Sequence, residues 1–184
     1  MIFRPALRPD RDSIISLHVE ISQQAYAQIL PHDYLRNAMP TEKLRLWKQR
    51  FEDLDDPNTQ ITVAQHEASV AGFICFQFDH EPEFGSYLHN LYLGRDWRGS
   101  GHGRALIRNA LVRFDPYRLG HAVHLIAFSE NAPARRLYDG LGGTVVEQSI
   151  RRRGNNPPVE VVRYQWQSAH HHRSEERFSR NAET

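Results

Sequence analysis

One stretch of the chain, residues 87–114, constrains the fold more than any other. Residues 87–93 are mostly apolar and β-forming, and they predict a strand. Glycines then stand at positions 99, 101 and 103, and after Gly103 apolar residues recur at the 3.6-residue spacing of a helix. This order of strand, glycine loop and helix N-terminus predicts a phosphate-binding site, because backbone N–H groups and the helix dipole both favour negative charge there.

The glycine pattern separates the common phosphate-binding motifs. A dinucleotide fingerprint, G-x-G-x-x-G, would need a third glycine where the chain has Arg104 or Leu106. A P-loop would need Gly-Lys followed by Ser or Thr, and the sequence contains no such triplet. The pattern that fits is R-x-x-G-x-G, from Arg98 to Gly103, with Arg98 and Arg104 adding positive charge on either side.

Composition narrows the class of protein. The 184 residues suit one domain with a substantial core. With 23 basic and 22 acidic residues the net charge is +1, which argues against a dedicated nucleic-acid or membrane-surface protein. The single cysteine, Cys75, excludes an internal disulfide, and no apolar run approaches the ~18 residues of a membrane-spanning helix. We therefore expect a soluble, cytoplasmic protein.

Periodicity along the chain predicts a strand, two helices, three strands, a helix, a strand, a helix and two strands. The strands are expected at residues 2–4, 59–65, 70–78, 87–93, 122–128, 144–150 and 159–166, and the helices after Pro9, after Thr41, from Gly103 and over residues 131–140. Residues 168–184 are polar with little to bury, so we expect a disordered tail after a domain of residues 1–167. No metal site is expected, including at the three histidines 170–172.

A second motif supports a resemblance to a known family. Residues 131–142 read N-x-x-A-x-x-L-Y-x-x-x-G, from Asn131 through Ala134 and Tyr138 to Gly142. With R-x-x-G-x-G about 30 residues earlier, this resembles the GNAT superfamily of acyl-CoA-dependent N-acetyltransferases. The resemblance implies an α+β fold, with a central, mostly antiparallel, splayed sheet of about seven strands flanked by about four helices. One departure is Gly143, where the family usually has phenylalanine.

The resemblance implies acetyl-CoA as cosubstrate and no metal cofactor. In the family, the glycine loop wraps the pyrophosphate of coenzyme A, and backbone groups of the preceding strand bind the pantetheine arm and the thioester oxygen. Asn131 either contacts the cofactor or caps its helix. The cofactor-binding residues implied in this chain are Leu91, Tyr92, Leu93, Arg98, Gly99, Ser100, Gly101, His102, Gly103, Arg104 and Asn131.

Two side chains are candidates for catalysis. Tyr138 matches the family tyrosine that protonates the leaving thiolate, and the alternative is a tyrosine that only packs. Many relatives carry a glutamate as general base at the position of Tyr87 or near Ile126, and this chain has none at either position. His89 is the best substitute, because strand alternation places it on the same face as Leu91 and imidazole titrates near neutrality. Water is the other candidate for the base.

The leading functional hypothesis is acetyl transfer from acetyl-CoA to the primary amine of a small molecule or peptide. The alternative is a catalytically silent GNAT-like sensor or subunit that binds acyl-CoA. A nucleotide or RNA binder is disfavoured by the near-neutral charge, so neither nucleic acid nor membrane is an expected partner. A homodimer is compatible with these features. Acceptor choice is expected from the helices after Pro31, from residues 79–85 and from the loop at 151–158.

Overall fold

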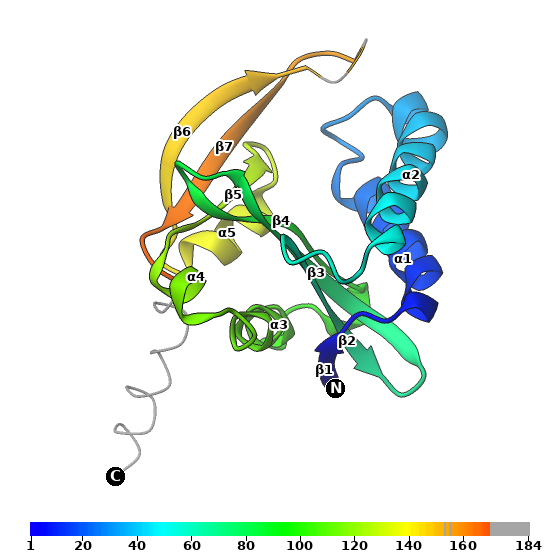
Figure 1. Ribbon diagram of the computed structural model, residues 1–184. Coiled ribbons are helices and arrows are strands. Elements are labelled where there is room, and N and C mark those ends of the chain that lie inside the picture. Colours follow the sequence, from blue (N-terminus) through cyan, green and yellow to red (C-terminus); the bar gives the residue numbers. More distant parts are fainter. Residues whose placement is uncertain (153, 155, 170–184) are drawn as a thin grey trace.

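The computed structural model describes residues 1–152, 154 and 156–169, except the side chain of Asp79. Figure 1 shows the arrangement of its strands and α-helices. The elements are β1 (Ile2–Pro5), α1 (Arg11–Ala25), α2 (Met39–Glu52), β2 (Thr59–His66), β3 (Ser69–Glu81), β4 (Gly85–Leu93), α3 (His102–Leu111), α4 (Pro116–Gly120), β5 (Val123–Phe128), α5 (Ala132–Asp139), β6 (Thr144–Arg151) and β7 (Val159–Trp166). Short turns of 3-10 or π helix occur at Arg8–Asp10, Tyr34–Ala38 and Arg95–Trp97.

The strands form one seven-stranded sheet in the order β1-β2-β3-β4-β5-β7-β6. All neighbouring pairs are antiparallel except β4 and β5, which are parallel over a short distance. This arrangement confirms the expected α+β class and the mostly antiparallel splayed sheet. The predicted strands and helices all occur, with ends that differ by a few residues.

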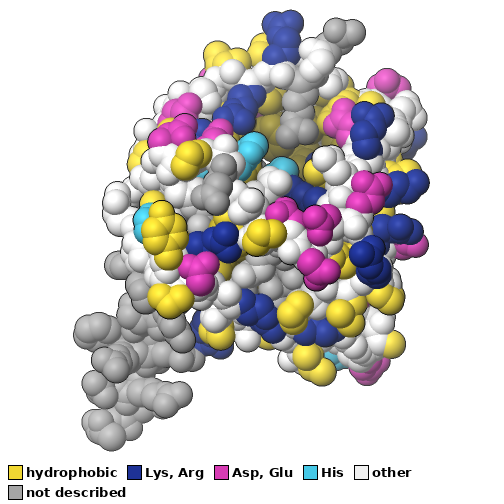
Figure 2. Space-filling view, viewed as in Figure 1, with side chains coloured by type: hydrophobic (Ala, Val, Ile, Leu, Met, Phe, Trp, Pro, Cys, Tyr) yellow, Lys and Arg dark blue, Asp and Glu magenta, His cyan; other side chains and the backbone are white. Residues whose placement is uncertain are grey.

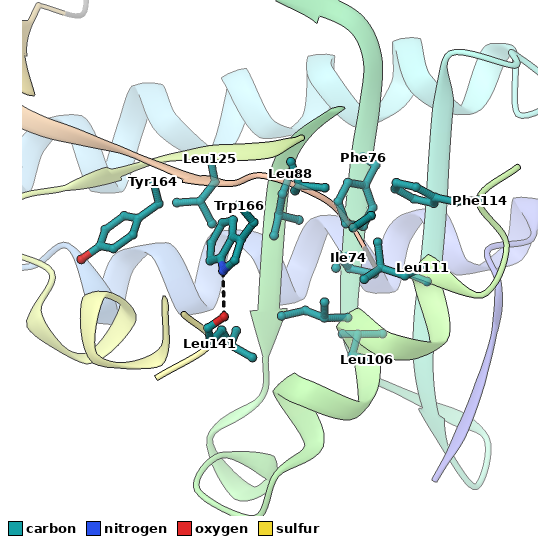
Figure 3. Packing of buried hydrophobic residues seen from close by; sticks show 14 of the residues in the cluster. Ile74, Phe76, Leu88, Leu106, Leu111, Phe114, Leu125, Leu141, Tyr164 and Trp166 are labelled. Carbon is teal, nitrogen blue, oxygen red and sulfur yellow. Dashed lines mark hydrogen bonds between the residues drawn. The ribbon is translucent and has the colours of Figure 1, made fainter. Parts of the chain in front are cut away.

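Helices cover both faces of the sheet. The amphipathic helix α3 packs its apolar side on β2, β3 and β4, forming a cluster that includes Leu106, Leu111 and Phe76 (Figure 3). Helices α1 and α2 lie on the opposite face (Figure 1), where Trp47 packs with Phe73 and other residues. Within the described residues, no helix is long and apolar enough to cross a membrane.

Two segments differ from the sequence-based expectation. Helix α4 was not predicted, because its five residues are too short for a periodic pattern; Asp115 caps it by accepting a hydrogen bond from the Arg118 N–H at 2.9 Å. The first two residues of the expected tail are packed. The Ala169 N–H donates to the His121 carbonyl at 3.1 Å, and Ala169 is fully buried. The rest of the expected tail, with its three histidines, lies outside the described residues.

The departure at Gly143 has a packing reason. A Cβ built on Gly143 would lie 2.6 Å from Cζ2 of Trp166, so the indole occupies the space of a side chain at this position. The Trp166 Nε1–H also donates to the carbonyl of Leu141 at 2.8 Å (Figure 3). The aromatic group that the family supplies from the end of this helix is thus supplied here from β7.

Candidate active site

The candidate site begins where β4 and β5 separate. The two strands pair only at Ser86 with Val123 and at Tyr87 with His124. Beyond Tyr87, β4 continues to Leu93 with β3 as its neighbour on one side and no pairing to β5 on the other. Backbone N–H and C=O groups of residues 88–93 on that side are therefore available to an extended ligand, as at a sheet edge.

A β-bulge lies inside this separated part of β4. Asn90 pairs with Cys75 and Leu88 pairs with Phe76, so His89 has no residue opposite it. The bulge changes the alternation of side chains. Leu91 packs against the cluster on the α3 face, whereas His89 contacts Arg50 of α2 on the other face. The prediction that His89 and Leu91 share a face is therefore wrong, because it assumed an uninterrupted strand.

The glycine loop follows directly after β4. Gly99 and Gly101 have φ angles of 79° and 78°, a left-handed region that other L-residues rarely adopt. No atom lies within 4 Å of a Cβ built on either residue, so the backbone faces open space. Gly101 is the N-cap of α3, and this glycine has no side chain to cap the first N–H groups of the helix. These N–H groups suit an anion, and the loop therefore fits the diphosphate predicted for it.

The two arginines beside the loop also brace it. The Arg98 Nε–H donates to the carbonyl of Leu93 at 2.9 Å, which ties the loop to the end of β4. Arg104 donates from Nη2 to the carbonyl of Gly140 at 2.6 Å, which joins α3 to the end of α5. Both side chains are exposed, so their positive charge reaches the mouth of the loop. Ser100 and His102 complete this segment, and the Nδ1 atom of His102 is buried without a hydrogen-bond partner.

Helix α5 and its N-cap position hold Tyr138 and Asn131, the two residues of the second motif for which a role is expected. The Asn131 Oδ1 accepts a hydrogen bond from the Ala134 N–H at 3.3 Å, so Asn131 caps the helix. Tyr138 packs on the same apolar cluster as Leu91, with its ring 5.5 Å from that of Tyr164. Burial raises the pKa of Tyr138 above its ordinary value, and the nearby hydroxyl of Tyr92 adds to the rise. The phenol therefore stays protonated at neutral pH and can donate its proton.

The part of the chain that holds β4, the glycine loop and α5 matches a known family. The model of the acetyltransferase (GNAT) family matches residues 23–142, which is more than half of the chain.
The chain belongs to the GNAT acetyltransferase family.
A curated relative, the 5-NmdU N-acetyltransferase of Pseudomonas phage PaMx11, is 32% identical over 95 residues. That match covers 51% of this chain and 64% of the relative, so the chain spans less than two thirds of the relative's length.

Solved GNAT structures share the fold at low sequence identity. A PaiA N-acetyltransferase from Thermoplasma acidophilum in complex with coenzyme A has a TM-score of 0.70 and 16% identity, covering 90% of this chain and 98% of that one. A spermidine N-acetyltransferase from Vibrio cholerae in complex with CoA and spermine has a TM-score of 0.66 and 17% identity, covering 92% and 96%. At these identities the likeness establishes the GNAT fold.

Aromatic side chains connect the end of α1 with β4 and with the end of β5, beside the place where β4 and β5 separate. The hydroxyl groups of Tyr26 and Tyr92 are 3.0 Å apart, and the Tyr26 ring meets Phe128 edge-on at 4.9 Å. Tyr26 follows the end of α1, Tyr92 lies on β4 and Phe128 ends β5. The side chain of Tyr92 thus bridges to α1, while its backbone belongs to the separated part of β4.

Helix α2 places a buried cation beside the bulge. Arg50 is 7% exposed and donates from Nη1 to Oδ1 of Asn90 at 2.7 Å. Its Nη2 contacts Nδ1 of His89, and its guanidinium lies 4.9 Å from the centre of the Trp47 ring. Burial lowers the pKa of Arg50 from its ordinary value. His89 thus lies beside this cation on the α2 face of β4, whereas Tyr138 packs against the apolar cluster on the α3 face.

A polar cluster closes the end of the splay where β4 and β5 still pair. Arg163 of β7 is buried, contacts Glu81 and donates from Nε to Glu147 at 2.7 Å. Its Nη1 also lies 2.8 Å from Nδ1 of His124, whose ring stacks on Tyr87 with centroids 4.8 Å apart. Glu81, which lies in the segment 79–85 expected to contribute to acceptor choice, is thus engaged by Arg163.

A groove lies on the α2 side of the site. Its volume is about 460 Å³, and its lining comes from the segment after α1, from α2 and from the β6–β7 loop. Two acidic residues, Asp33 and Glu42, are among the lining residues, and Glu42 accepts a hydrogen bond from the Tyr34 hydroxyl at 2.6 Å. Figure 2 shows histidine side chains near the middle of the face in view, with charged side chains of both signs around them. Arg153, in the same loop, lies outside the described residues.

Three residues of the site were missed from the sequence. In the sequence, Arg50 is one of several charged residues after Thr41, and Tyr26 follows the apolar positions of the first helix, so neither was a candidate. His124 lies inside an apolar strand, where a histidine is usually structural. Of the three, only His124 carried a signal, since a polar residue inside an apolar strand needs a partner.

Proposed function

We propose that the chain transfers an acetyl group from acetyl-CoA to a primary amine of a small molecule or peptide. One observation carries the proposal: the unpaired stretch of β4 leads into the open glycine loop and packs beside Tyr138. The curated relative is named an N-acetyltransferase, and the solved PaiA neighbour holds coenzyme A, which supports the same chemistry here. The single buried cysteine accords with a cytoplasmic location.

The proposed binding mode follows from the backbone. The glycine loop from Gly99 to Gly103 takes the diphosphate on its N–H groups and on the start of α3. Leu91, Tyr92 and Leu93 bind the pantetheine arm and the thioester oxygen through backbone groups that β5 leaves unpaired. Asn131 caps α5 and adds a polar contact to the cofactor from the other side of the splay.

The proposed reaction needs a neutral amine and an acid. The amine nitrogen attacks the thioester carbonyl carbon, so that a C–N bond forms and the oxygen gains negative charge, which backbone N–H groups of β4 stabilise. The C–S bond then breaks, and Tyr138 donates its proton to the departing thiolate. The amine nitrogen loses a proton to water, and the tyrosinate takes a proton back from water. The products are an N-acetyl amine and free coenzyme A.

The acceptor is proposed from the chemistry of the groove. Asp33 and Glu42 give its lining negative charge, which suits an amine that arrives as a cation. A direct test measures thiol release with spermidine, an alanine-starting peptide and 5-NmdU, because relatives are named for acceptors of these kinds. Turnover with one acceptor supports the enzyme. Tight acetyl-CoA binding with no turnover across a broad amine panel would favour the sensor alternative.

The glycine loop gives a test of cosubstrate binding that does not depend on the acceptor. Gly101→Glu puts a side chain and a negative charge into the proposed phosphate site and forces a residue with a Cβ to a φ of 78°. We expect acetyl-CoA binding, measured by calorimetry, to be lost. Gly120→Glu is the matched control, because Gly120 is exposed in α4 and nothing lies near its Cβ position. Unchanged affinity in a folded Gly101→Glu variant would refute the binding mode.

A further inference from the structure

Arg50 of α2 contacts two consecutive side chains of β4. Its Nη1 atom donates to Oδ1 of Asn90 at 2.7 Å, and its Nη2 atom contacts Nδ1 of His89. In a regular strand consecutive side chains point to opposite faces, so a residue packed on one face meets only one of them. Arg50 meets both because β4 bulges at His89, which has no residue opposite it on β3. The two ends of the guanidinium thus contact the two residues of the bulge.

The core holds the strand on either side of the bulge. Leu88 and Leu91 both pack in the apolar cluster on the α3 face. In the sheet, Leu88 pairs with Phe76 and Leu91 pairs with Ile74. These contacts fix where β4 enters and leaves the bulge, and they involve neither of the two residues inside it. The side chains inside the bulge are contacted from the opposite face, by Arg50.

Arg50 is itself held in place. It is 7% exposed, and its guanidinium lies 4.9 Å from the centre of the Trp47 ring, within the range of a cation–π contact. Trp47 is fully buried and donates from Nε1 to Nδ1 of His18 in α1 at 2.9 Å. The planar guanidinium of a buried arginine that rests on a fixed indole can hold two neighbouring groups in one geometry.

The bulge lies in the part of β4 that the proposed function uses. β4 pairs with β5 only at Ser86 and Tyr87, so the bulge belongs to the separated part of the strand, directly before Leu91. Backbone N–H groups alternate between the two sides of a strand, and an extra residue shifts that alternation. The place of the bulge therefore decides which N–H groups turn toward the open side, where the thioester oxygen is proposed to bind.

We propose that Arg50 is a positioning residue. By holding His89 and Asn90 it fixes the place of the bulge in β4 and, through the bulge, the N–H groups that polarise the thioester carbonyl. This role depends on the proposed acetyl transfer and adds to it a part for helix α2. Loss of Arg50 is expected to change the environment of the reacting carbonyl more than the binding of the rest of the cofactor, because the diphosphate is held separately at the glycine loop.

The first test measures the thioester carbonyl in the bound cofactor. Infrared difference spectra of the full chain with acetyl-CoA labelled with ¹³C at this carbonyl, without an amine, give its stretching frequency, which falls when N–H groups donate to the oxygen. We expect a lowered frequency in the unmutated protein and a return toward the value of free acetyl-CoA in Arg50→Met. Arg45→Met, at an exposed position of α2, is the control and should keep the lowered frequency. A lowered frequency that persists in Arg50→Met, or no lowering in the unmutated protein, would overturn the proposal.

The second measurement separates binding from turnover. Arg50→Met should bind free CoA with the affinity of its parent, measured by calorimetry, whereas kcat should fall about 10²-fold, as a misplacement of the reacting groups by about 1 Å costs. If the unmutated protein binds no acetyl-CoA, the proposed function and the role of Arg50 fail together. If it binds and transfers the acetyl group, and Arg50→Met has the same kcat, only the role of Arg50 fails.

A further variant tests the same contact from the strand side. Asn90→Ala removes the hydrogen-bond acceptor and leaves Arg50 in place. We expect the carbonyl frequency and kcat to change in the same direction as in Arg50→Met. The double variant should be no worse than Arg50→Met alone, because the two side chains form one contact. Effects that add in the double variant would show that the two side chains act independently, which contradicts the proposal.

Discussion

Tyr138 carries the proposed acid step through a single hydroxyl group. The variant Tyr138→Phe keeps the ring against Tyr164 and Trp166 and removes only the acid. We expect turnover to fall ~10²–10⁴-fold, the usual contribution of a positioned general acid, while the Kd for acetyl-CoA changes little. Steady-state thiol release and calorimetry measure the two quantities. The rate should recover partly with acyl donors whose leaving thiol is more acidic, since such a group needs less help.

The control for this variant is Tyr117→Phe, because Tyr117 is 72% exposed and has no part in the proposed chemistry. It should leave both turnover and binding unchanged. Full turnover in Tyr138→Phe would mean that the thiolate takes its proton from water, and the role assigned to Tyr138 would have to be abandoned.

Gly143 is the residue whose substitution should most disturb packing. A Cβ there meets Cζ2 of Trp166 at 2.6 Å and Cδ1 of Tyr164 at 3.0 Å, and neither ring can move freely in the core. Gly143→Ala is therefore expected to lower the free energy of unfolding by about 1–3 kcal/mol, as overpacking does. Chemical denaturation measures the change, with Gly120→Ala as a control in open space. A Gly143→Ala protein as stable as its parent would show that Trp166 can shift.

Residues in local motifs could be predicted from the sequence, and residues defined by long-range contacts could not. The glycine loop, the cap at Asn131 and the position of Tyr138 follow from short spacings along one element. The face of His89 was predicted wrongly because a bulge in β4 leaves no mark in the apolar pattern. Arg50 could be recognised as a site residue only from its hydrogen bond to Asn90, which lies 40 residues later in the sequence.

At the scale of elements, the strands and long helices could be predicted because apolar residues recur along the buried face of each with the period of a strand or a helix. The splay between β4 and β5 was expected only through the family resemblance, since no residue pattern states where two parallel strands stop pairing. Two segments show the opposite limit. Helix α4 is too short for a periodic pattern, and residues 168 and 169, after β7, are held by hydrogen bonds to a distant segment, which periodicity does not report.

The packed residues Ser168 and Ala169 give a prediction for α4. Ser168 donates from its hydroxyl to the Leu119 carbonyl at 3.2 Å, and the Ala169 N–H donates to the His121 carbonyl. A chain ending after Ala169 keeps both contacts, whereas one ending after Gln167 loses them and exposes the C-terminal part of α4. We expect the melting temperature to fall only for the shorter chain, with cofactor binding kept in both. Equal melting temperatures would show that the two contacts add nothing.

At the scale of the whole molecule, the cluster around Arg163 makes stability depend on pH. Burial and the neighbouring guanidinium lower the pKa of His124 from 6.5 to about 4. Between these values the unfolded chain binds a proton that the folded chain does not, so stability falls as the pH drops from about 6.5 to 4. The loss is at most about 3 kcal/mol. The pKa of Glu81 is lowered by its hydrogen bond to Arg163, so its protonation weakens the same cluster at still lower pH.

Denaturant unfolding at pH 7 and at pH 4.5 measures this dependence, and His124→Gln is the matched variant because it cannot titrate. The variant is expected to lose less stability on acidification than its parent, although it can be less stable at pH 7. A parent protein with the same free energy of unfolding at both pH values would contradict the assignment to His124.

The position of Cys75 has a practical consequence for all of these measurements. It is the only cysteine of the chain, it is fully buried beneath α1 and α2, and burial raises its pKa to about 11. A thiol reagent needs an exposed thiolate, and the folded protein offers none. A colorimetric reagent can therefore stay in the cuvette throughout the reaction. Any colour that develops faster than the blank reports coenzyme A, and slow extra colour equal to one thiol per chain reports unfolding.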